Sequence, residues 1–189
     1  MLIDDFGGRI ATLWSELRPS TRGFVERALQ ERSGSTQTSR NFHYDARADI
    51  ELSRFLAALD TEEGSGLKSL ADTCAAVLLE KTESAEVFTQ LVRRAKSQRD
   101  YQRIDTLADA LTSRFPPSEI CELARSEDVV VRELANEALA RCPLSVLTDL
   151  LNDPVDAETA RAALRRQVVE YGSEEARQIV NVLDQAEEF

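Results

Sequence analysis

The sequence predicts an all-α protein, and three observations carry this prediction. Apolar residues recur with the three- and four-residue spacing of a helix in almost every segment of the 189-residue chain. No run alternates apolar and polar residues long enough to predict a strand. The chain holds only 7 glycines and 5 prolines, and aromatic residues make up 6%. Sandwiches and barrels need more turn, β-branched and aromatic residues than this, so an all-β fold is excluded.

We expect about 10–11 helices joined by short connections. The expected helices, in chain order, cover 8–17, 20–32, 46–60, 66–81, 84–96, 100–114, 117–125, 129–141, 143–151, 156–170 and 173–187.

The first two helices form a predicted N-terminal hairpin. The first of them carries one apolar stripe with helical spacing, made of Ile10, Leu13, Trp14 and Leu17. Trp14 is expected in the core. Alternatively, it anchors a contact between two copies of the chain, which predicts a homodimer through residues 8–32.

A polar stretch separates this hairpin from the rest of the chain. Residues 33–41 are small and polar, with nothing to bury, so we expect a linker there. The division gives two predicted domains, a helical hairpin with its polar loop at 1–45 and a domain of paired helices at 46–189.

The next four helices are predicted from apolar stripes of their own. The stripes consist of Leu52, Phe55, Leu56 and Leu59; Leu67, Leu70, Ala71, Cys74 and Leu78; Val87, Phe88, Leu91, Val92 and Ala95; and Ile104, Leu107, Ala108 and Leu111. Each set lies on one face of a helix, which predicts packing of that face against a neighbour.

Helix-start and helix-end residues set the boundaries of the later helices. Pro116 and Pro117 end one helix and can start the next. Asp128 and Asp153 precede helical stretches and are expected as N-caps. Gly172 stands just past a helix end, a good C-cap position.

A repeat links the last helix pairs. Residues 128–139 align with residues 153–164 at an offset of 25, which matches Asp128 with Asp153, Ala135 with Ala160, Ala138 with Ala163, and Leu139 with Leu164. A weaker third copy begins at Asp100, offset by 28. An amphipathic helix precedes each copy, so the unit is a pair of helices. One unit cannot bury its apolar face alone, which predicts stacked units.

This pattern resembles the second helix of HEAT repeats, an armadillo-like family. The matching residues are Asp128, Val131, Arg132, Ala135, Ala138 and Leu139. The copy at Asp153 departs from the family pattern, with Asp156 and Ala157 where valine and arginine belong. The resemblance implies a right-handed α-solenoid of short helical hairpins, with residues 173–187 as its capping helix, and implies a binding scaffold.

The charge of the chain narrows its partners. The net charge is −11, which argues against nucleic acid and against an anionic membrane surface as ligands. Residues 115–189 carry 16 acids and seven bases, so we expect a partner protein with a basic segment. No run is apolar over the ~18 residues of a membrane span, and the N-terminus lacks the apolar core of a signal peptide. We therefore expect a cytoplasmic protein.

Histidine and cysteine usage predicts no metal and no cofactor. His43 is the only histidine, which excludes sites built from two or more histidines. Cys74, Cys121 and Cys142 lie on or near apolar stripes and form no CxxC pair. We expect them as buried reduced thiols in a reducing compartment.

One segment holds residue types used in catalysis. It contains His43, Tyr44 and Asp45, preceded by Ser33, Ser35 and Ser39. A Ser-His-Asp site needs a rigid base within hydrogen-bond reach of the nucleophile, and a polar loop is a poor place for one. We therefore expect no catalytic residue.

A basic cluster stands out in this acidic chain. It comprises Arg93, Arg94, Lys96, Arg99 and Arg103. Much of its charge is expected to complement the end of helix 84–96. Alternatively, together with Arg132, it forms a docking patch for an acidic partner or a phosphate group.

These observations favour a non-catalytic protein–protein interaction scaffold. Two alternatives come from other classes. A HEAT-like enzyme that removes alkylated bases from DNA would need a basic groove, which the charge disfavours. A helical-repeat lyase or chaperone subunit for a prosthetic group would need a pocket, and no residue pattern indicates one.

Overall fold

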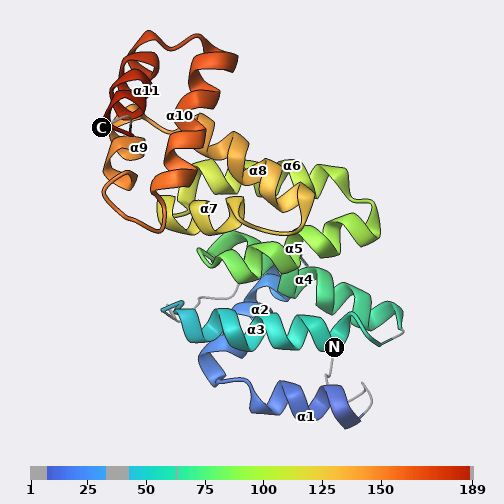
Figure 1. Ribbon diagram of the computed structural model, residues 1–189. Helices are drawn as coiled ribbons and strands as arrows, with labels where there is room; N and C mark the ends of the chain where they lie inside the picture. The colour runs from blue at the N-terminus through green and yellow to red at the C-terminus, as the bar shows by residue number, and fades with distance from the viewer. Residues whose placement is uncertain (1–7, 33–42, 63, 188–189) are drawn as a thin grey trace. The chain divides into compact units, whose positions relative to one another are not determined.

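The computed structural model describes residues 8–32, 43–62 and 64–187 (Figure 1). Over these residues the chain is helical, with no strand. The helices are α1 (Gly8–Glu16), α2 (Pro19–Arg32), α3 (Ala46–Leu59), α4 (Ser65–Lys81), α5 (Ala85–Gln98), α6 (Tyr101–Arg114), α7 (Pro117–Ala124), α8 (Val129–Ala140), α9 (Leu144–Leu150), α10 (Ala157–Tyr171) and α11 (Glu174–Glu187). The all-α prediction is confirmed. In the described ranges, no helix has the length and apolar character needed to cross a membrane.

The chain divides into two compact units, Met1–Leu91 and Val92–Phe189, and the boundary falls inside α5. This differs from the division at residue 45 expected from the polar stretch. The reason is that α1 packs on α3 and α2 packs on α3 and α4, so the N-terminal hairpin is part of the first unit. The polar stretch at 33–41 itself lies outside the described residues.

The core of the first unit forms where α1 and α2 cover α3. Ile10, Trp14 and Leu17 are buried, as the apolar stripe predicted. The rings of Trp14 and Phe55 lie 5.5 Å apart between centroids. Trp14 therefore lies in the core of its own chain, where burying a ring of this size contributes strongly to packing.

Gln90 fixes the start of α5 against α3 in the same unit. Its side-chain amide donates to the backbone carbonyl of Ser53 at 3.0 Å, and the Ser53 hydroxyl donates to its Oε1 at 2.6 Å. These paired bonds satisfy polar groups that packing partly removes from water.

In the second unit, α6, α8 and α10 pack side by side in that order. α8 contacts both α6 and α10, α7 contacts α8 and α9, and α11 contacts α10. The same registers are buried in the three copies of the repeat: Leu107, Ala110 and Leu111; Ala135, Ala138 and Leu139; Ala160, Ala163 and Leu164. The alanines allow the backbones of neighbouring helices to approach, and the leucines fill the space between them.

The amino ends of the repeated helices differ. Asp128 is the N-cap of α8, and its carboxylate accepts from the backbone N–H of Val130 and Val131. Asp153, expected to do the same for α10, instead accepts from Val155 at 2.9 Å within a turn. α10 begins at Ala157, one residue from the expected start, with Asp156 at its N-cap position. The expected N-cap at Asp153 is therefore wrong, because one extra turn precedes the helix.

Two helix ends adopt left-handed backbone. Gly172 ends α10 with φ 65°, the expected C-cap. Arg99 ends α5 with φ 56°, and the N–H of Asp100 donates to the carbonyl of Ala95 at 2.9 Å. This closing pattern ends many helices, although glycine is the residue that usually occupies the left-handed position. α5 therefore ends at Gln98, two residues after its expected end at Lys96.

Candidate functional site

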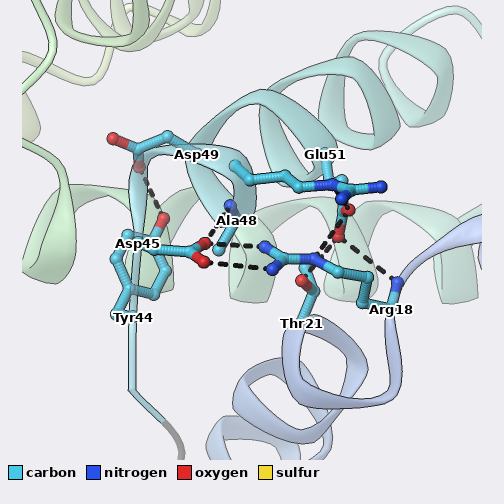
Figure 2. Close-up of polar contacts among 8 residues, drawn as sticks. Arg18, Thr21, Tyr44, Asp45, Ala48, Asp49 and Glu51 are labelled. Atoms are coloured by element: carbon cyan, nitrogen blue, oxygen red, sulfur yellow. Dashed lines mark hydrogen bonds and ion pairs between the residues drawn. The ribbon is translucent and has the colours of Figure 1, made fainter.

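The best-connected group of polar side chains lies at the start of α3. Asp45 is the N-cap of α3, and its carboxylate accepts from the N–H of Ala48 at 2.8 Å. Arg18, in the turn between α1 and α2, donates through Nη2 and Nη1 to the two Asp45 oxygens at 2.6 and 3.0 Å. Its Nε donates to Glu51 at 2.9 Å, so the guanidinium lies between the two carboxylates (Figure 2). We call Arg18, Thr21, Asp45 and Glu51 the Arg18 cluster.

The electrostatics of the Arg18 cluster keep its carboxylates ionised. Hydrogen bonds from Arg18 and from the backbone of Ala48 hold the pKa of Asp45 well below its usual range. Burial alone would raise the pKa of Glu51, but hydrogen bonds from Thr21 and from Arg18 lower it. The Thr21 hydroxyl donates to Glu51 at 2.6 Å. Hydrogen bonding to Asp45 raises the pKa of Arg18 further.

Asp49, one turn into α3, has the opposite environment. Its carboxylate is buried and accepts from the hydroxyls of Tyr44 at 2.5 Å and Thr82 at 2.9 Å. Burial raises the pKa of Asp49 despite these bonds, and burial also raises the pKa of Tyr44. The Tyr44 ring meets Phe24 edge-on at 5.1 Å. Asp49 thus ties the start of α3 to the segments before α3 and before α5.

This arrangement joins helices rather than presenting reactive groups. The carboxylates of Asp45, Asp49 and Glu51 are occupied by donors from their own chain. His43 is exposed beside them, and the three serines expected near it lie outside the described residues. Within the described parts of the chain, no group of three or more His, Cys, Asp or Glu residues could hold a metal ion.

Two members of the predicted basic cluster meet at the N-cap of α8. Lys96 Nζ lies 2.9 Å from both carboxylate oxygens of Asp128. Arg93 Nε lies 3.9 Å from the same carboxylate. The hydrogen bond from Lys96 lowers the pKa of Asp128. The charge of α5 therefore complements the start of α8 as well as the end of α5 itself.

The other basic candidates lie in separate settings. Arg94 is buried and donates to Gln98 at 3.1 Å, and Arg103 pairs with Asp100 at 3.4 Å. Arg132 donates to the carbonyl of Ser126 at 2.9 Å, just ahead of α8. Arg99 is exposed at the end of α5.

One ion pair of the second unit, in which the carboxylate is buried, was not among the residues expected from the sequence. Arg125 Nη1 donates to Asp156 at 2.9 Å and to the carbonyl of Val155 at 3.2 Å. The Asp156 side chain is only 5% exposed. The repeat could have indicated this pair. Asp156 stands 25 residues after Val131, which is buried, so the repeat places a carboxylate at an apolar position.

The cysteines occupy packed positions. Cys74 and Cys121 are buried and Cys142 is half-buried. Burial raises the pKa of Cys121 to about 12 and also raises the pKa of Cys142. Thiols in such surroundings stay protonated and react slowly.

Comparisons of the chain with protein-family models, with curated proteins and with solved structures find no match.

Proposed function

We propose that the chain is a non-catalytic protein–protein interaction scaffold built on HEAT-like helical repeats that stack as a right-handed α-solenoid. The observation that supports it most is the matched burial of three helices in the second unit. Three residues with the same spacing are buried in each helix: Leu107, Ala110 and Leu111 in α6; Ala135, Ala138 and Leu139 in α8; and Ala160, Ala163 and Leu164 in α10. Equal registers in successive helix pairs are typical of repeat proteins.

Ion pairs between successive helix pairs support the same proposal. Lys96, near the end of α5, pairs with Asp128 at the start of α8. Arg125, at the end of α7, pairs with Asp156 at the start of α10. Each pair joins the end of one helix to the start of the helix three further along the chain. The recurrence favours units that stack in a regular order.

A scaffold of this kind binds through surface rather than through a pocket. Stacked helix pairs expose an extended face in proportion to their number. The acidic balance of residues 115–189 favours a basic partner over nucleic acid or membrane. The expected reduced thiols favour the cytoplasm as the place of binding.

The test is capture of a partner followed by reconstitution. The full tagged chain is used as bait in an extract of the cells that make it, beside an Ala135→Asp bait. A charge at the fully buried Ala135 disrupts the packing of α8, so this variant controls for binding that does not need the fold. We expect a protein enriched on the wild-type bait alone that forms a stoichiometric complex when both proteins are purified.

Two results would overturn the proposal. One is the same set of proteins on both baits. The other is a change in the covalent mass of the purified partner after incubation, since that would indicate an enzyme.

A further inference from the structure

Exposed apolar residues lie on the outer sides of the repeated helices, at the starts of α6 and α8 and near the end of α10. α6 and α8 each carry one large apolar residue that their packing leaves in water, and α10 carries two, Val169 and Tyr171. Tyr101 is 70% exposed, Val129 is 59% exposed and Val169 is 83% exposed. Helical spacing places each of them on the side of its helix away from the buried register. Exposed apolar residues that share one face are a feature of interaction surfaces.

Acidic residues share this side at equivalent positions. Asp105, Glu133 and Glu158 are separated by the repeat offsets of 28 and 25. Each is exposed and stands two residues before the first residue of the shared buried register, Leu107, Ala135 or Ala160, which places it about half a helical turn away from that register. Because α8 packs against both α6 and α10, the three helices present these residues on consecutive elements of one unit.

Two basic residues of α10 pair with carboxylates of their own chain. Arg165 Nη2 lies 2.8 Å from Asp184 of α11. Arg166 lies 3.1 Å from Glu137 and 2.8 Å from Glu170, with Glu133 more distant at 3.7 Å. The pairing of Glu133 with Arg166 is therefore weak, and its side chain is 59% exposed. Asp105, Glu133 and Glu158 therefore leave carboxylates exposed on this side.

We propose that this surface, formed by Tyr101, Asp105, Val129, Glu133, Glu158 and Val169, binds a basic segment of a partner protein that carries apolar residues among its lysines or arginines. The inference rests on the proposed scaffold function and names its binding surface. The carboxylates select the positive charge, and the valines and the tyrosine ring bury the apolar side chains of the segment. A second copy of the chain is a poorer occupant, because it would bring the same negative surface against this one.

The test measures binding of a fluorescein-labelled peptide of lysine and leucine to the full chain by fluorescence anisotropy. A peptide in which glutamate replaces every lysine serves as the negative probe. We expect the lysine peptide to bind and the glutamate peptide not to bind. The triple variant Asp105→Lys, Glu133→Lys and Glu158→Lys should raise the Kd at least about tenfold, which corresponds to about 1.4 kcal/mol.

A matched control separates this surface from the overall charge. The triple variant Glu122→Lys, Asp149→Lys and Glu175→Lys changes the net charge by the same amount at exposed positions on α7, α9 and α11. We expect it to raise the Kd less than about threefold, since distant surface charges are screened. Equal weakening by both triple variants would overturn the proposal.

The apolar residues are tested at constant charge. A variant with Tyr101→Ser, Val129→Ser and Val169→Ser should also raise the Kd about tenfold while circular dichroism shows unchanged helicity. Unchanged affinity would overturn the assignment of the surface.

If a captured partner binds the wild-type chain and the surface variants equally well, the scaffold function stands and this surface is wrong. If the chain proves to be a dimer that only the surface variants dissociate, the surface belongs to a second copy and the proposal fails.

Discussion

Arg99 shows how one residue can carry a strained backbone at a helix end. Among the described residues, it is the non-glycine residue with positive φ. A side chain in this conformation costs about 1–2 kcal/mol. Glycine avoids this cost, but part of the gain is offset because glycine has more conformational entropy in the unfolded chain. We therefore expect Arg99→Gly to raise the free energy of unfolding by about 0.5–1 kcal/mol, measured by urea denaturation.

A glycine placed inside a helix is the control for this prediction. Arg54 is exposed in the interior of α3, where backbone φ is helical. Arg54→Gly should lower the free energy of unfolding by about 1 kcal/mol. A loss of stability in both variants would show that the left-handed end of α5 is not strained.

At the residue scale, features that depend on neighbours in sequence could be predicted, and contacts between residues distant in sequence could not. The caps at Asp128 and Gly172 follow from propensities within one turn. The contact of Arg18 with Asp45 and Glu51 joins residues about thirty positions apart. No spacing in the sequence encodes such a contact, because it depends on how α1 and α2 pack on α3.

At the scale of helices, the repeat register makes a sharp prediction about Arg125 and Asp156. Arg125→Met leaves the buried carboxylate of Asp156 without its cation. We expect a loss of about 2 kcal/mol, below the 3–5 kcal/mol typical of a fully buried pair because the Arg125 side chain is 40% exposed. Thermal and urea unfolding measure the loss.

The rescue variant tests the register itself. The repeat offset matches Asp156 with Val131, which is fully buried. Asp156→Val added to Arg125→Met should therefore recover the stability of the wild type to within about 1 kcal/mol. Asp156 makes no cap bond to its helix, so the substitution removes no N-cap. A double variant weaker than Arg125→Met alone would show that the two positions are not equivalent.

The N-terminal hairpin gives a second prediction at this scale. Arg18→Met removes the cation that lies between Asp45 and Glu51. We expect a lower melting temperature at neutral pH and a smaller difference between the melting temperatures at pH 7 and pH 3, because both carboxylates return toward ordinary pKa values. Differential scanning calorimetry measures both quantities.

Arg47→Met is the matched control for the hairpin variant. Arg47 also pairs with Glu51, at 3.3 Å, but its side chain is 72% exposed. Exposed pairs contribute little to stability, so we expect almost no change. Equal effects of the two substitutions would show that the Arg18 cluster acts only through general charge.

The helix boundaries could be predicted from the sequence because apolar stripes and end residues act locally. The N-cap of α10 could not, because the Asp153 carboxylate accepts from Val155 within the preceding turn, and Asp156, which is paired with Arg125, takes the N-cap position. The division into units was also inaccessible. The polar stretch marks a connection along the chain, but α1 and α2 still bury their apolar faces against α3 and α4.

At the scale of the whole molecule, acid sensitivity depends on carboxylates in both units. Hydrogen bonds and cations lower the pKa values of Asp45, Glu51, Asp128 and Glu137 in the folded chain. In the unfolded chain these groups titrate near pH 4. The unfolded chain therefore binds more protons as the pH falls through this range. Stability is present above about pH 5 and is lost as the pH falls toward 3.

Asp49 opposes this trend. Its folded pKa is raised, so the folded chain holds a proton there more tightly than the unfolded chain does. In the pH range between the ordinary pKa and the raised pKa of Asp49, the folded chain loses stability as the pH rises and regains it as the pH falls. We expect Asp49→Asn to remove the gain, so the melting temperature drops more between pH 7 and pH 4 in the variant than in the wild type.

Repeating both scans in about 0.5 M salt separates the local effect from the net charge of −11, because salt screens exposed charges and leaves the buried Asp49 bonds. A steeper wild-type profile would mean that the carboxylate of Asp49 is ionised throughout, with its two hydroxyl donors outweighing burial.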